Sequence, residues 1–243
     1  MTRHHVLVLT GAGISADSGV RTFRDADGLW EGHRVEDVAT PDGWARDPRR
    51  VWRFYQERRA QLRTVQPNAA HVALAAFGNT LTAFGHTFTL VTQNVDDLHD
   101  RAGHEDDVLH MHGELTKLRC ERCETVIDDR VHFDSGRFVP CAVCEHPRLR
   151  PHIVWFGEMP FHMAAIERAL SSCTHFVAIG TSGKVWPAAG MLSQARAAGA
   201  VTWVQSLEAP DNLEALDRYH EGRAALVVPT LLGDLQRELT ASS

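Results

Sequence analysis

The sequence has no apolar run long enough to cross a bilayer, and its first residues, MTRHH, lack the apolar stretch of a secretory signal. It also has no excess of positive charge. Its 25 Lys and Arg against 31 Asp and Glu give a formal net charge of −6, which implies no broad basic surface for nucleic acid. No internal repeat or low-complexity segment is visible. These absences predict a cytoplasmic protein with no membrane partner and no direct nucleic-acid partner, and we expect a monomer.

Cysteine is scarce, at five residues in 243, and the composition is otherwise ordinary. The hydrophobic content of 44% and the charged content of 23% are typical of a globular protein. The length suits one large domain, or one domain with a modest insertion. In a cytoplasmic chain, few cysteines at regular spacing favour metal binding over disulfides.

Strand and helix signals alternate along most of the chain. Asp47-Pro48 and Pro67-Asn68 each read as a helix start, and further helices are expected at 164–171, near 187 and from 230. This alternation predicts an α/β fold with a Rossmann-like, doubly wound parallel sheet. The expected strands are 6–9, 88–92, 176–179, 201–205 and 224–228.

The first strand runs straight into glycines. Gly11, Gly13 and Gly19 give the spacing G-x-G-x5-G, which differs from the common dinucleotide fingerprint. Glycines after a buried strand allow backbone N–H groups to approach a phosphate closely. A tight strand-to-helix turn explains this stretch about equally well.

Polar side chains follow a later strand at Gln93, Asn94 and Asp96. Open α/β sheets bind ligands at the carboxyl ends of their strands, and amide plus carboxylate groups suit a carboxamide. A helix cap rich in Asn and Asp is the alternative. Nearby, His112 precedes a glycine that leaves room for a substrate, whereas His110 is interpreted as structural.

Two C-x2-C pairs form the clearest motif. Seventeen residues separate them, which is the spacing of a four-cysteine zinc ribbon, and a set of four thiolates describes a closed structural site. Two disulfides are the less favoured alternative. Cys173 is left over and is interpreted as a buried core thiol. The expected ligands are Cys120, Cys123, Cys141 and Cys144.

Two further segments allow a functional and a structural interpretation. Tyr55 and Arg58 share one helix stripe with Val51 and Leu62, where apolar residues are expected. The spacing alone favours a structural salt bridge for Arg58 over a ligand carboxylate. In the segment 154–156, exposed aromatics beside an extended stretch suit peptide capture by strand addition, although an ordinary core strand is the simpler explanation.

Together, several motifs closely resemble those of the sirtuins, the NAD-dependent protein deacylases. Within that family the chain is most similar to bacterial members close to the class that removes acidic acyl groups. The resemblance covers nearly the whole chain and is specific only in combination. The motifs are GAGISADSGVRTFR, TQNVD, HMHGEL, the four cysteines, VWFGEMP and GTSGKVWPAAG.

The resemblance implies a Rossmann-like domain with an inserted small domain that carries the zinc ribbon. We expect residues 1–33, 80–118 and 150–243 in the first, and residues 34–79 and 119–149 in the second. It also implies that Tyr55 and Arg58 recognise an acyl carboxylate, which reverses the preference for a salt bridge.

The implied cofactors are NAD and Zn2+, and the implied substrates are acylated lysine side chains of proteins. His112 is the implied general base, with Asn94 also catalytic. The implied peptide-binding residues are Val154, Phe156, Gly157 and Glu158. The implied NAD contacts are Gly11, Ala12, Gly13, Ser15, Phe23, Arg24, Gln93, Asn94, Asp96, Gly180, Thr181, Ser182, Ser206, Leu207, Glu208 and Ala224.

By resemblance, the acyl group passes to ADP-ribose and nicotinamide is released. The activity would cover acetyl, succinyl and malonyl groups. One position departs from the family: Ser206 stands where an Asn is usual, so the contact with the adenosine ribose is expected to be weaker or bridged by water. Mono-ADP-ribosyl transfer is one alternative function, and a non-catalytic NAD- and zinc-binding adaptor is another.

Overall fold

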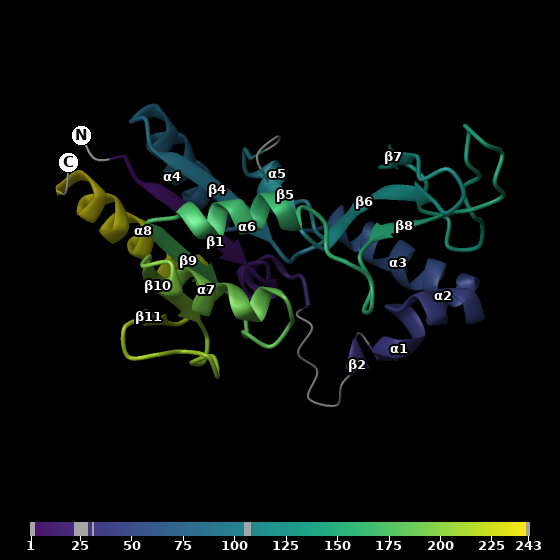
Figure 1. Cartoon of the computed structure of the whole chain (residues 1–243). Coiled ribbons are helices and arrows are strands. Elements are labelled where there is room, and N and C mark those ends of the chain that lie inside the picture. The colour runs from purple at the N-terminus through teal and green to yellow at the C-terminus, as the bar shows by residue number, and fades with distance from the viewer. Residues whose placement is uncertain (1–2, 22–28, 31, 105–107, 242–243) are drawn as a thin grey trace.

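All strands of the main sheet run parallel. Along the chain, strands are added first on one side of the first strand and then on its other side. The computed structural model describes residues 3–21, 29–30, 32–104 and 108–241 (Figure 1). From β1, the sheet continues through β4 and β5 on one side and through β9, β10 and β11 on the other. The carboxyl end of β1 is therefore a topological switch point, where open α/β sheets place their ligands. The strands are β1 (His5–Thr10), β4 (Thr87–Thr92), β5 (Val108–His110), β9 (His175–Ile179), β10 (Val201–Ser206) and β11 (Arg218–Glu221).

Helices cover both faces of this sheet, as the doubly wound fold requires. Successive residues of β1 alternate between two cores: Val6 and Val8 pack under α4 (Ala69–Ala83) and α8 (Ala224–Ala241), whereas Leu7 and Leu9 pack under α6 (Met163–Ser172) and α7 (Met191–Ala197). Both faces of the strand are apolar because both are buried. Among the described residues, no helix is both long and apolar enough to cross a membrane.

A second unit lies beside the main sheet and has its own core (Figure 1). Its antiparallel sheet has the order β7–β6–β8, and three helices pack against it. A short hairpin, β2 (Leu29–Trp30) and β3 (His33–Arg34), precedes these helices. The other elements of the unit are α1 (Val35–Val38), α2 (Pro41–Arg46), α3 (Pro48–Leu62), β6 (Gly113–Cys120), β7 (Val126–Asp128) and β8 (Leu149–Ile153).

The two expected helix starts are confirmed. Asp47 caps α3 by accepting a hydrogen bond from the Arg50 amide at 3.0 Å, and Pro48 occupies the first turn. Asn68 caps α4 by accepting from the Ala70 amide at 2.9 Å. The short helices that complete the fold are η1 (Ala12–Ile14), η2 (Ala16–Ser18), α5 (Leu98–Arg101) and η3 (Ala188–Gly190).

The packing divides the chain differently from the expected domain boundaries. Helix α4 was assigned in part to the small domain, but Leu74 and Phe77 pack into the core of the main sheet, against α8. Conversely, β6 and β8 were assigned largely to the main domain, yet Leu118 and Ile153 lie in the small unit's core. Apolar periodicity identifies a buried face but does not show which neighbour covers it.

The last strand was also placed wrongly. Residues 224–228 are the first turns of α8, and Pro229 lies within that helix. A short apolar run does not by itself distinguish a strand from a helix. The true last strand, β11, is the polar edge segment Arg218–Glu221. The helical spacing of the buried positions could have revealed α8: Ala224, Val228, Leu231, Leu232, Leu235 and Leu239.

Candidate active site

Two glycine loops cross at the switch point. The amides of Gly11 and Gly13 donate hydrogen bonds to the carbonyls of Ile179 and Gly180, at 2.9 and 2.8 Å. A Cβ on Gly13 would lie 2.7 Å from the Gly180 Cα, and one on Gly11 would lie 2.9 Å from the Gly180 oxygen. Glycine is therefore required here for the crossing of the two loops, and not only for the approach of a phosphate. The crossing therefore fixes the loops after β1 and β9 against each other.

Ser15 is fully buried at the centre of a polar network beside the glycine crossing. Its hydroxyl accepts a hydrogen bond from the Asn94 side-chain amide at 3.1 Å. Nε2 of the His71 ring lies 3.4 Å from the same Ser15 hydroxyl oxygen. Since His71 Nδ1 accepts from the Asn68 amide at 3.3 Å, Nε2 carries the proton and donates to Ser15. Helix α4 thus helps to fix Asn94 in place.

Asp96 joins the same network. Burial raises its pKa to about 6, although hydrogen bonds from Ser15 and the Leu98 amide partly offset that effect. The Gln93 side chain donates to the Thr181 hydroxyl at 3.1 Å and so links the loops after β4 and β9. Gln93, Asn94 and Asp96 therefore lie together beside the glycine crossing, and Asn94 and Asp96 are almost completely buried.

His112 follows β5 and is held in one tautomer. Its Nδ1 lies 3.0 Å from the Gln93 carbonyl oxygen, which can only accept, so Nδ1 carries the proton and Nε2 is the basic nitrogen. Burial lowers the pKa of His112, and the bond to Gln93 offsets this only in part. His112 is therefore neutral at neutral pH, which is the form a general base needs.

His110 forms an ion pair with Asp100 at 3.2 Å and lies near enough to the Asn94 network for its charge to act on Asp96. Burial alone would lower the pKa of His110, but the hydrogen bond and the charge of Asp100 raise it. This pairing explains the buried histidine without any ligand.

The loops after β9 and β10 lie at the same carboxyl edge of the sheet. Thr181 and Ser182 follow β9 and are half-buried. Ser206, at the end of β10, is buried and donates its hydroxyl to the Glu208 carbonyl at 2.6 Å, while Leu207 is 51% exposed. The Ser206 hydroxyl is thus satisfied inside its own loop, which is consistent with a weakened contact to a ligand. Ala224 is buried at the start of α8, and the predicted contacts Phe23 and Arg24 lie outside the described residues.

Tyr55 is the most deeply buried of the predicted substrate residues. It is fully inaccessible, and its hydroxyl accepts a hydrogen bond from the Trp155 indole at 3.0 Å. Burial raises the pKa of Tyr55, so its hydroxyl stays protonated and can still donate. Trp155 was expected to be an exposed aromatic but is only 2% exposed. Its neighbour Val154 donates to the His112 carbonyl at 2.9 Å, which links the segment of Trp155 to His112.

Arg58 lies one turn beyond Tyr55 on α3. Its guanidinium donates to the Phe54 carbonyl and lies over the Phe54 ring, 3.3 Å from the ring centroid. The Trp30 ring lies 5.6 Å away. An aromatic wall around a half-buried guanidinium is compatible with bidentate recognition of a carboxylate.

The segment predicted to bind the peptide, residues 154–158, already makes some hydrogen bonds within the protein. The amides of Val154 and Phe156 already donate to His112 and Ala39, so an added strand would use the carbonyls of this segment. Burial alone would raise the pKa of Glu158, but two hydrogen bonds from Arg150, at 2.7 and 2.9 Å, lower it. Gly157, with a φ of 91°, faces open space.

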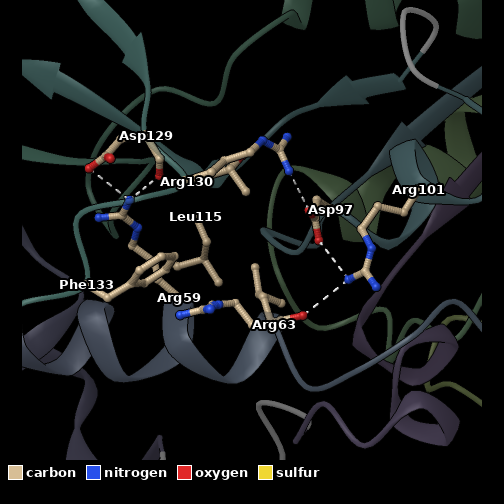
Figure 2. A pocket seen from close by; sticks show the side chains of 10 residues that line it. Arg59, Arg63, Asp97, Arg101, Leu115, Asp129, Arg130 and Phe133 are labelled. Carbon is tan, nitrogen blue, oxygen red and sulfur yellow. Dashed lines mark hydrogen bonds and ion pairs between the residues drawn. The ribbon is translucent and has the colours of Figure 1, made fainter.

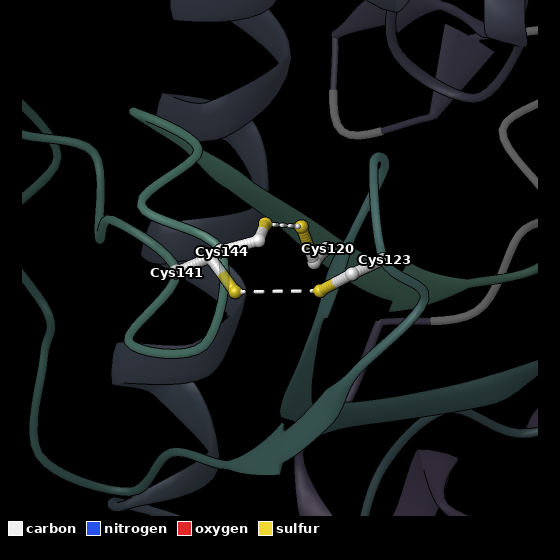
Figure 3. Close-up of side chains that lie close together, drawn as sticks. All are labelled: Cys120, Cys123, Cys141 and Cys144. Carbon is white, nitrogen blue, oxygen red and sulfur yellow. Dashed lines mark hydrogen bonds between the residues drawn. The ribbon is translucent and has the colours of Figure 1, made fainter.

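The four predicted cysteines converge at the end of the small sheet (Figure 3). The Sγ atoms of Cys120 and Cys144 lie 3.6 Å apart, as do those of Cys123 and Cys141. Four sulfurs at about 2.3 Å from one tetrahedral ion would lie about 3.8 Å apart, so the cluster fits a zinc ion. The two loops match in detail, because Glu124 and Glu145 each follow a pair with a φ of 59°.

The sequence profile of the Sir2 family matches residues 11–187. The chain belongs to the Sir2 family. It is 52% identical to the NAD-dependent protein deacylase of Escherichia coli K12, over all of this chain and 86% of that relative. It is 51% identical to the enzyme of the same name from Pasteurella multocida, over 93% of this chain and 96% of the relative.

Solved Sir2 structures share the fold. A Sir2 homologue in complex with NAD has a TM-score of 0.85 and 34% identity, covering 97% of this chain and 90% of that chain. A Sir2 protein bound to a myristoylated histone peptide has a TM-score of 0.71 and 29% identity, covering 98% and 93%. In this Sir2 chain, the glycine crossing and the Asn94 network lie together at the switch point, and the cysteine cluster lies in the small unit.

Sequence reasoning missed three residues of this Sir2 site. His71 supports Ser15, Trp155 supports Tyr55, and Arg150 holds Glu158. A signal existed only for His71, since it stands three residues after the Asn68 cap, where a side chain can bond back to the cap. The bond between Trp155 and Tyr55 joins residues 100 apart in the sequence, whereas Arg150 and Glu158 are only eight apart, on the two sides of a turn with no periodic pattern.

Proposed function

We propose that this Sir2 chain is an NAD-dependent protein-lysine deacylase that accepts acetyl, succinyl and malonyl groups. The observation that supports this most directly is the convergence of His112, Asn94 and the glycine crossing at the switch point. The curated relatives named NAD-dependent protein deacylase, at 51–52% identity, agree with it.

The buried polar groups suit NAD. Asn94 and Asp96 offer an amide and a carboxyl group for the carboxamide and the ribose hydroxyls, while Thr181 and Ser182 would meet the phosphates and the ribose. When bound, NAD supplies an electrophilic ribose carbon that takes the acyl group as nicotinamide leaves. His112 Nε2 would accept a proton from a ribose hydroxyl. Its lowered pKa keeps that nitrogen free to do so at neutral pH.

Tyr55 and Arg58 would bind the end of the acyl group that is remote from the lysine. A protonated, buried hydroxyl and a guanidinium fork are complementary to a carboxylate. Succinyl and malonyl groups carry such a carboxylate, and acetyl does not. Tyr55 is bonded to Trp155, whose chain neighbour Val154 is bonded to His112, so one connected segment links Tyr55 to His112.

The test is turnover of matched acetyl-, succinyl- and malonyl-lysine peptides with NAD, followed by mass spectrometry. We expect loss of the acyl mass from the peptide and equal release of nicotinamide. The His112→Ala variant should lose this turnover. A mass gain on protein without acyl loss would instead indicate ADP-ribosyl transfer, and an inactive wild type would indicate an adaptor.

We also propose that the protein acts in the cytoplasm as a monomer. Four cysteines arranged as metal ligands require thiolates, which persist in reducing compartments. Sedimentation of the purified chain at micromolar concentration would show a single species near 27.0 kDa if it is a monomer.

A further inference from the structure

A cavity lies between the two units, apart from the Asn94 network and Tyr55 (Figure 2). Its volume is about 280 Å3. Pockets that bind small molecules occur preferentially at domain interfaces. The lining comes from α3, the start of α5, β6 and the loop after β7: Arg59, Leu62, Arg63, Asp97, Arg101, Leu115, Thr116, Asp129, Arg130 and Phe133.

The lining carries more positive than negative charge. Four arginines face two aspartates, so the cavity has a formal charge of +2. Two ion-paired groups stand on opposite walls in Figure 2. Arg59 pairs with Asp129 at 3.0 Å on one wall, and Asp97 bridges Arg130 at 2.9 Å and Arg101 at 3.6 Å on the other. Low-dielectric walls that focus one sign of charge concentrate counter-ions of the other sign.

Two donors remain for a ligand. Arg63 lies over the Phe133 ring, 5.0 Å from its centroid, and among the described residues no carboxylate pairs with it. The Thr116 hydroxyl is buried and, within the described part of the chain, has no hydrogen-bond partner. Arg130 also faces the cavity with a 53% exposed side chain; Asp97 pairs with its Nη1 and Asp128 with its Nε, so Nη2 is the part of the guanidinium left for a ligand among the described residues. A guanidinium fork and a hydroxyl are donors that match phosphate or carboxylate oxygens.

We propose that this cavity binds a small polyanion carrying two or more phosphate or carboxylate groups. Arg63, at the end of α3, and Arg130, in the loop after β7, hold the anionic groups, and Thr116 on β6 donates to one oxygen. All three donors belong to the small unit. This binding does not depend on the proposed function, because it uses none of the residues assigned to NAD or to the acyl group.

The experiment is isothermal titration of the full, zinc-loaded chain with pyrophosphate and, separately, with tricarballylate. Binding that Arg63→Gln leaves unchanged is assigned to the cofactor site and does not support the cavity. We expect one probe to bind at a single site, with an affinity that falls as salt is raised. Arg63→Gln should weaken binding by about tenfold or more, as loss of a charged donor does. Arg53→Gln, an exposed arginine on the same helix away from the cavity, should change it less than about twofold.

Thr116→Val keeps the shape of the side chain and removes the hydroxyl, so it should also weaken binding without unfolding the protein. Tighter binding of pyrophosphate would identify the ligand class as phosphates, and tighter binding of tricarballylate would identify carboxylates. Absence of binding by both probes in low salt would overturn the proposal and leave the arginines as a structural ion-pair network. Equal losses in Arg63→Gln and Arg53→Gln would also overturn it.

Discussion

Tyr55 makes a structural hydrogen bond in addition to its proposed role in substrate recognition. Its hydroxyl is the acceptor for the buried Trp155 indole at 3.0 Å. Tyr55→Phe leaves that N–H without a partner, and an unsatisfied buried donor costs about 1–3 kcal/mol. We therefore expect a lower melting temperature, by about 2–4 °C for each kcal/mol lost in a chain of this length.

The chain offers a matched control in its second tyrosine. Tyr219 donates only a long hydrogen bond, at 3.4 Å, from a half-buried position. Tyr219→Phe should leave the melting temperature nearly unchanged in calorimetry. If both variants melt like the wild type, the Trp155 bond contributes nothing to stability.

Arg58 tests acyl specificity directly. Arg58→Met keeps the length of the side chain over Phe54 and removes the charged fork. Loss of one charged partner in a buried pair costs ~2–5 kcal/mol, and about 1.4 kcal/mol is tenfold in rate. We expect succinyl-lysine turnover to fall at least about tenfold, while acetyl-lysine turnover stays within a few-fold. Arg53→Met, on the exposed side of α3, is the control. A parallel fall in both activities and in thermal stability would show that Arg58 is structural.

The pH dependence of turnover should report His112. Only its neutral form accepts a proton, and burial lowers its pKa below the ordinary 6.5. Activity is therefore fully present above pH 6.5 and is lost as the pH falls through the lowered value. The acid limb of kcat/KM should have its midpoint below 6.5. Asp96, with a pKa raised to about 6, titrates nearby, so the Asp96→Asn profile separates the two groups. A midpoint above 6.5 would contradict the assignment of His112 as the base.

Among the elements, those with local signals were predicted and those without were not. Asp47 and Asn68 mark α3 and α4 because a capping side chain bonds to amides two or three residues away. The C-x2-C spacing likewise encodes the ribbon. By contrast, β11 is polar and at the edge of the sheet, so it carries no apolar alternation. The bond between Tyr55 and Trp155 joins residues 100 apart in sequence, which no local pattern reveals.

The ribbon between the cysteine pairs depends on its metal. The segment between β6 and β8 is polar and mostly irregular, and only β7 pairs within it. It cannot bury a core of its own, so metal binding contributes its folding energy. Cys141→Ser should lower the melting temperature and reduce zinc content measured by mass spectrometry of the metal. Cys173→Ser changes a buried thiol outside the cluster and should leave zinc content unchanged. Equal zinc in both variants would disprove the ligand set.

The described residues form three cores, and the cysteine cluster belongs to one of them. Cys120 and Cys141 lie in the small unit's core with Tyr55 and Trp155, whereas the two cores of the main sheet, as far as the structure describes them, contain no cysteine of the cluster. Zinc removal should therefore loosen the small unit, with Tyr55, before it loosens the sheet. Hydrogen exchange measured after chelation should rise in 113–156 and in α3 while β1, β9 and α8 stay protected. Loss of protection throughout the chain at the same zinc occupancy would mean that the two units unfold as one.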